Sequence, residues 1–142
     1  MRAPNRPKTA NDYFAADMAL QHAGQYQKAL EQYTAALRLE PKHFAAQVNA
    51  GICNLALKNF ESAISAFKAA ASLGPDEPHV QFDLGVACAG AGRTLDAIAA
   101  LKEAIRLDPK MTQAYRALAL FYGDKGDYEA AVRLMSQAAQ QR

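Results

Sequence analysis

Apolar residues recur along this chain at intervals of three and four positions, which is the spacing of one face of an α-helix. The clearest run has these apolar positions: Tyr26, Ala29, Leu30, Tyr33, Ala36 and Leu37. Runs of this kind predict amphipathic helices near 26–39, 60–73, 94–107 and 128–140. A second set of runs precedes them and predicts partner helices near 11–23, 44–57, 78–90 and 112–124.

The helical pattern returns every thirty-four residues. In each copy an alanine is followed four residues later by a large side chain. These pairs are Ala29 and Tyr33, Ala63 and Phe67, Ala97 and Leu101, and Ala131 and Met135. A methyl group lets two helices approach closely, and the large side chain fills the wider gap beside it. The period predicts four helix–turn–helix repeats, with bounds 10–43, 44–77, 78–111 and 112–142.

Glycine and proline mark the turns of this repeat. Gly24, Gly92 and Gly126 share the fifteenth position, where a helix commonly ends in a left-handed residue. Lys58 takes this position in the second repeat, so we expect a tighter or slightly strained turn there. The second helices end before a proline, because proline cannot continue a helix. These prolines are Pro41, Pro75 and Pro109.

The spacing of these residues resembles the tetratricopeptide repeat, a helix–turn–helix unit of thirty-four residues. The resemblance covers residues 10–142 and includes Gly51 and Gly85 at the eighth position of their repeats. The first repeat departs from it, since Asp17 stands where glycine is usual. The resemblance implies an all-α fold, a right-handed α-solenoid of four units and about eight helices. It also implies a concave face, lined by the first helices, that binds an extended or helical peptide.

Composition and charge narrow the class of protein. Hydrophobic residues make up 51% and charged residues 21% of the 142 positions, so we expect a globular domain with a sizeable core. The net charge of +2 is too balanced for a protein that binds nucleic acid or anionic membranes. Residues 1–9 combine prolines with basic and polar side chains, which favours a flexible lead-in.

Targeting signals and cysteine usage bear on the compartment. No run approaches the ~20 consecutive apolar residues of a membrane-spanning helix, and no apolar core of a secretory signal follows the N-terminal basic residues. Cys53 and Cys88 each stand alone in a helical pattern, which favours small buried residues of a reducing compartment. We therefore expect a cytoplasmic protein without membrane insertion.

Groups that could carry chemistry are scattered. His22, His43 and His79 have no acidic partner at the spacing of metal ligands. The glycine-rich stretch 85–92 follows no predicted strand, and its glycines fall on packing and turn positions, which disfavours a phosphate-binding loop. The cysteines have no base at a predictable spacing. We expect no enzymatic activity, no metal site and no cofactor.

The first helices carry the positions that would contact a partner. In tetratricopeptide folds, set positions of these helices line the concave surface, and here they are mostly apolar. Exposed apolar surface of that extent marks an interaction site, although the same side chains could instead fill the core between repeats. The candidate groove residues are Phe14, Met18, Val48, Asn49, Ile52, Phe82, Asp83, Val86, Arg116 and Leu120.

Polar residues in this set suggest how a ligand would be held. The Asn49 amide can both donate and accept, which suits a peptide backbone. Asp83 and Arg116 either pair with each other or select the charge of a ligand. The cationic residues of repeats that clamp the carboxylate of heat-shock chaperones are absent, so that clamp is not expected. The stretch 77–92 looks similar to chaperones of type III secretion translocators, which usually have three repeats and an acidic balance.

The end of the repeat array leaves a second hypothesis open. No polar capping helix follows the fourth repeat, so Val132, Met135 and Ala139 should have little cover. Either the chain associates with itself there or it continues in a longer protein. The leading hypothesis is a non-enzymatic scaffold or chaperone-like adaptor that binds an apolar peptide segment of a protein partner in its concave groove. The alternative is a structural assembly module that forms homo-oligomers or a larger complex through its uncapped ends or convex face.

Overall fold

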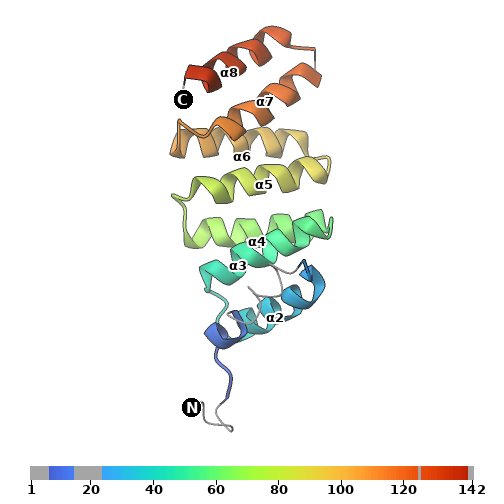
Figure 1. Cartoon of the computed structure of the whole chain (residues 1–142), viewed down its shortest axis with the longest axis vertical. Coiled ribbons are helices and arrows are strands. Elements are labelled where there is room, and N and C mark those ends of the chain that lie inside the picture. Colours follow the sequence, from blue (N-terminus) through green and yellow to red (C-terminus); the bar gives the residue numbers. More distant parts are fainter. Residues whose placement is uncertain (1–6, 15–23, 125, 141–142) are drawn as a thin grey trace. The chain divides into compact units, whose positions relative to one another are not determined.

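A computed structural model describes residues 7–14, 24–124 and 126–140 of the chain. Residues 10–14 are helical, and the remaining described residues form further helices joined by turns, with no strand. Figure 1 labels these helices α2 (Tyr26–Leu39), α3 (Phe44–Ala56), α4 (Phe60–Leu73), α5 (Pro78–Gly90), α6 (Thr94–Leu107), α7 (Thr112–Asp124) and α8 (Tyr128–Gln140). They group into two compact units, Met1–Leu73 and Gly74–Arg142.

The predicted helices agree with these bounds almost to the residue. α3 differs, since it ends at Ala56 where the prediction extended to 57. The first predicted helix, 11–23, lies mostly outside the described residues, which include its helical start at 10–14. Most of the predicted lead-in 1–9 also lies outside them, and its flexibility stays a prediction. The prediction of an all-α fold made of helix–turn–helix units is confirmed.

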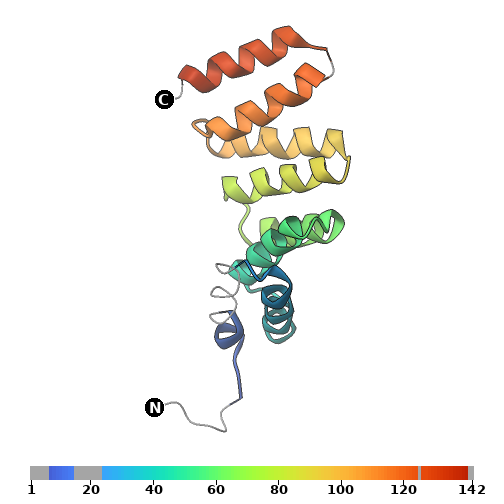
Figure 2. The ribbon, with the colours of Figure 1, turned by 45° about the vertical axis from the view of Figure 1, so that its right-hand side comes forward.

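In the first unit, α3 packs between α2 and α4, and α3 lies beside α4 in both Figure 1 and Figure 2. Ala29, Tyr33 and Ala36 of α2 are completely buried in this core. A Cβ atom added to Gly51 of α3 would lie 2.6 Å from Cε1 of Phe67 in α4. The glycine therefore allows the aromatic ring to pack directly on the backbone of α3.

In the second unit, α5 packs against α6, and α7 packs against both α6 and α8. Ile98 and Leu101 of α6 form a buried core with Leu118 of α7. A Cβ atom added to Gly85 of α5 would lie 2.9 Å from Cγ of Leu101. The small residue of the first helix and the large residue of the second helix are thus direct neighbours, which allows the two helices to pack densely.

The turns that join α3 to α4, α5 to α6 and α7 to α8 share two features among their described residues. Lys58, Gly92 and Gly126 all have left-handed backbone, with φ of 62°, 78° and 82°. In each turn the next amide donates to a carbonyl five residues earlier, for example from Asn59 to Asn54 at 2.8 Å. The Lys58 turn is therefore not tighter than the others. It carries the cost of a side chain in a glycine conformation.

The outer face of α8 is open, as predicted. Val132, Met135 and Ala139 are all exposed. The α6 residues equivalent to Val132 and Met135, Ile98 and Leu101, are buried, so the pattern alone does not bury a side chain.

Candidate functional site

An apolar pocket of about 300 Å³ lies in the second unit, between α5 and α7, with Leu101 of α6 among its walls. Val86 from α5 and Leu120 from α7 both line it and are 37% and 70% exposed. The remaining lining residues are Gly85, Ala89, Ala117, Phe121 and Asp124. Two of the predicted groove residues therefore meet in one accessible pocket, and the charged group among its described lining residues is the Asp124 carboxyl group.

Phe82 and Asp83 precede this pocket on α5. Phe82 is half-buried and packs against the core formed by α6 and α7, so at least part of its surface serves packing. Asp83 is half-buried, and burial raises the pKa of its carboxyl group from 3.8 to about 6, while the positive charge of His79 acts in the opposite direction. The fold therefore disfavours the charged form of Asp83.

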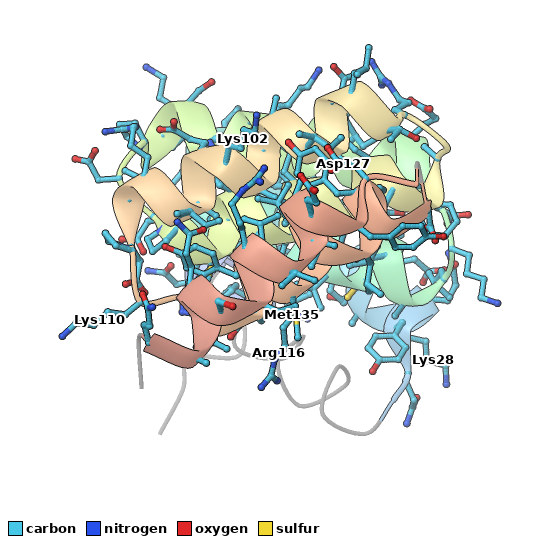
Figure 3. The ribbon with its side chains drawn as sticks, turned by 90° about the horizontal axis from the view of Figure 1, so that it is seen from above. Lys28, Lys102, Lys110, Arg116, Asp127 and Met135 are labelled. Atoms are coloured by element: carbon cyan, nitrogen blue, oxygen red, sulfur yellow. The ribbon has the colours of Figure 1, made fainter. Side chains whose placement is uncertain are left out.

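Arg116 lies on α7 and is exposed. The described part of the chain shows no ion pair between Arg116 and Asp83, so the pairing considered from the sequence is not present. Figure 3 shows Arg116 on the same side of the second unit as Met135, with Lys102 and Asp127 on the opposite side. Arg116 is thus available to a ligand, although it does not line the apolar pocket.

In the first unit three of the candidate residues lie on α3. Val48 and Ile52 are four residues apart, which places them on one face of the helix, and both are half-buried. Asn49 is half-buried beside them and makes no side-chain hydrogen bond to any residue within 7–14, 24–124 or 126–140. Its role as a holder of peptide backbone stays a prediction.

Phe14 is more involved in packing than the groove prediction implies. Its ring centroid lies 5.9 Å from that of Tyr33 and 5.1 Å from that of His43. His43 caps α3, since its Nδ1 accepts the Ala46 amide at 3.1 Å, and Nε2 lies 3.0 Å from the Asn11 side-chain oxygen. Phe14 therefore helps to fix the start of α3. Met18, the other candidate from the first repeat, lies outside the described residues.

Two large side chains of the pocket were not predicted from the sequence. Phe121 and Leu101 both line the apolar pocket, although neither occupies a position expected to face the groove. Leu101 already appears in the sequence as the large partner of Ala97, and that signal indicates helix packing. Only the spacing between α5 and α7 reveals that its side chain also forms a wall of the pocket.

The described residues also bear on metal, thiol and membrane sites. Among the described residues, no three His, Cys, Asp or Glu side chains come together as metal ligands. Cys53 and Cys88 are both buried, as predicted, and no disulfide joins them. None of the described helices has both the length and the apolar character needed to cross a membrane.

Comparison with known proteins defines the class. A family model described as "Tetratricopeptide repeat" matches residues 18–78, 55–112 and 82–142. The chain belongs to the tetratricopeptide repeat family, whose repeats build protein–protein interaction modules. This result confirms the family predicted from the repeat.

Solved structures agree on the fold. MamA from Desulfovibrio magneticus RS-1 superposes with a TM-score of 0.89 at 24% identity, covering 93% of this chain and 75% of that one. A crystal structure of MamA gives a TM-score of 0.91 at 22% identity, covering 93% of this chain and 77% of that one. None of the curated proteins compared with this chain matches it. These likenesses establish the tetratricopeptide fold and leave the partner to be inferred from the site.

Proposed function

We propose that the chain is a non-enzymatic interaction module that binds an apolar peptide segment of a protein partner. The observation that carries this proposal is the apolar pocket between α5 and α7, into which Leu120 and Val86 expose apolar surface. An accessible pocket of this kind is unfavourable in water unless a ligand covers it. A leucine- or phenylalanine-sized side chain is the natural occupant.

Burial of the ligand side chain supplies the affinity. At ~25 cal/mol per Å² of apolar surface, two or three anchoring side chains contribute several kcal/mol, part of which is lost to ordering the peptide. Micromolar affinity follows from that balance. Asp124 is the charged residue of the lining, so neutral or basic ligand residues beside the anchor are favoured over acidic ones.

The first unit contributes a second contact surface on α3. Val48 and Ile52 offer apolar contacts there, and the amide of Asn49 is suited to hydrogen-bond a peptide unit. A chaperone-like adaptor would use such contacts to cover an apolar segment of its client. In this proposal each unit has its own contact surface: Asn49 of the first unit hydrogen-bonds a peptide backbone, and the pocket of the second unit selects apolar side chains.

Substitution of the most exposed pocket residue tests the proposal. The probe is a fluorescein-labelled peptide in which leucine and serine alternate, and the measurement is fluorescence anisotropy. Leu120→Asp should weaken binding at least ~10-fold, because it places a charge in an apolar site. Asn49→Ala should weaken it by roughly 3-fold to 10-fold through the loss of one hydrogen bond.

Leu95→Asp is the matched control. Leu95 of α6 is as exposed as Leu120 but lies outside the pocket, so its substitution should change affinity less than about 2-fold. Helicity measured by circular dichroism should remain unchanged in all three variants. Equal losses for Leu120→Asp and Leu95→Asp would show that the peptide binds elsewhere.

A second candidate function is assembly through α8. The exposed side chains of Val132 and Met135 favour it, because this apolar surface has no cover within the described unit. Sedimentation velocity over a hundred-fold concentration range tests it, with Val132→Ser/Met135→Ser as the variant. Self-association predicts a mass that rises with concentration in the original chain and stays constant in the variant. A constant monomer mass for the original chain rules it out.

A further inference from the structure

A second and larger cavity opens on another side of the second unit. It has a volume of about 530 Å³ and lies between α6 and α8, with residues of α7 at its base. Figure 3 shows two of its lining residues, Lys102 and Asp127, on the side opposite Arg116 and Met135. None of its lining residues was a candidate in the sequence, and Leu120 and Val86 do not take part in it. The cavity therefore needs its own explanation.

The base of this cavity is apolar. Leu118 is buried at the bottom, and the half-buried side chains of Ile105 and Leu134 form the two walls. Tyr115 also lines the cavity, but its hydroxyl group donates to the Pro109 carbonyl at 2.9 Å, so this donor already has a hydrogen-bond partner. A ligand would meet apolar and aromatic surface here, in a volume within the ~300–1,000 Å³ typical of binding pockets.

The rim is cationic. Lys102 on α6 and Arg133 on α8 both line the cavity from separate helices, and both are exposed. Neither forms an ion pair with another residue of the described ranges. Two positive groups at the mouth of an apolar cavity define a site for a ligand that is acidic and apolar at once.

Nearby carboxyl groups have other roles. Asp127 lines one end of the cavity, and its Oδ1 accepts the Ala130 amide at 3.1 Å as the cap of α8. Glu103, next to Lys102 in the sequence, accepts a hydrogen bond of 2.9 Å from Nε of Arg106. Lys102 and Arg133 thus outnumber the single acidic group of the cavity, which leaves a net positive site.

We propose that this cavity binds an acidic peptide segment. An apolar side chain of the segment packs on Ile105, Leu118 and Leu134, and flanking carboxylates pair with Lys102 and Arg133. Nucleic acid is disfavoured, because it needs a run of cations along the phosphate backbone, and this cavity offers two. The site lies apart from the pocket between α5 and α7 and takes a ligand of different charge.

The test uses a labelled peptide in which glutamate flanks a central phenylalanine and leucine, with capped ends. Fluorescence anisotropy should show saturable binding that weakens as salt is raised. Lys102→Glu and Arg133→Glu should each weaken binding by about 10-fold or more, because each replaces a charge-assisted contact by repulsion. Ile105→Ser should weaken it as well, since the apolar anchor loses a wall of its site.

Two controls separate this site from general electrostatics and from the first pocket. Lys110→Glu makes the same charge change in the second unit outside the cavity and should alter affinity less than about 2-fold. Leu120→Asp, which tests the pocket between α5 and α7, should leave acidic-peptide binding intact. The acidic peptide and the peptide of alternating leucine and serine thus report on different sites. Failure of one peptide to bind while the other still binds distinguishes failure of this proposal from failure of the proposed function.

Three outcomes would overturn the proposal. One is an equal loss of affinity in Lys110→Glu and Lys102→Glu, which indicates non-specific attraction. Another is equal binding of a peptide with lysine in place of glutamate. The third is displacement of the acidic peptide by single-stranded DNA in a manner that Lys102→Glu abolishes, which would assign the cavity to nucleic acid.

Discussion

The helix pairs α5–α6 and α7–α8 are built from the same repeat positions, yet their second helices have different surroundings. Ile98 and Leu101 of α6 are 9% and 1% exposed, whereas the equivalent Val132 and Met135 of α8 are 64% and 47% exposed. The residue types are similar, so composition does not explain the difference. α6 is covered by α7, and no described helix covers the corresponding face of α8. Burial in a repeat protein is thus a property of neighbours.

The largest expected effect comes from truncating the equivalent large residues. Leu101→Ala should lower the free energy of unfolding by about 3 kcal/mol, because it leaves a cavity in a closed core. Met135→Ala should cost less than about 1 kcal/mol, since its side chain is already half in water. Urea denaturation followed by circular dichroism measures both. Similar losses in the two variants would mean that α8 is covered in solution, for example by another copy of the chain.

A second comparison uses glycines in the first helices of the two pairs. Gly85→Ala should destabilise by about 1–3 kcal/mol, because its Cβ would lie 2.9 Å from Cγ of Leu101 and 3.3 Å from the Ala97 carbonyl oxygen. Gly123→Ala in α7 has no atom within 4 Å of the added Cβ and should gain up to about 1 kcal/mol of helix propensity. Thermal unfolding of the two variants in parallel is the measurement. A stable Gly85→Ala protein would contradict the close approach of α5 to α6.

A third test concerns an acidic side chain of α5 whose repeat position holds an uncharged residue in α7. Asp83 occupies the repeat position that is Ala117 in α7, and its pKa is raised from 3.8 to about 6. A raised carboxyl pKa means that the fold binds this proton more tightly than the unfolded chain does. The resulting contribution to the free energy of unfolding is fully present below about pH 4 and is lost as pH rises through about 6.

Asp83→Asn removes that pH dependence. The difference in unfolding free energy between variant and original chain should grow in favour of the variant from pH 4 to pH 7. We expect this difference to change by about 1 kcal/mol, because the side chain is partly solvated and solvent screens part of the effect of the pKa shift. Urea titrations at pH 4, 5, 6 and 7 measure the difference. A constant difference across this range would show that Asp83 is solvated in the folded protein.

The smallest effect extends the comparison to the α3–α4 pair. Its turn has Lys58 in the left-handed conformation that Gly92 and Gly126 adopt in the other two pairs. Lys58→Gly should raise the free energy of unfolding by about 0.5 kcal/mol, because relief of the left-handed strain exceeds the entropy that glycine adds to the unfolded chain. Gly92→Ala should lower it by about 1 kcal/mol. Destabilisation by Lys58→Gly would indicate that the lysine side chain makes a stabilising contact.

The candidate site was only partly predictable. Val86 and Leu120 were expected to face a groove and do line a common pocket, whereas Phe14 and Phe82 pack against cores. All four occupy groove positions of the repeat, and an apolar side chain at such a position can point either into the groove or into the core. The cationic cavity was not predicted at all, because Lys102 and Arg133 are thirty-one residues apart and belong to different helix pairs.

The sequence by itself determined the helices, their turns and their family. Period, glycine and proline act through local backbone physics, so α2 to α8 begin and end close to where the sequence places them. Tertiary structure alone decided which apolar positions are covered, where pockets open and how far the pKa of Asp83 is raised. These properties depend on distances between residues that are remote in the chain, and no repeat pattern encodes such distances locally.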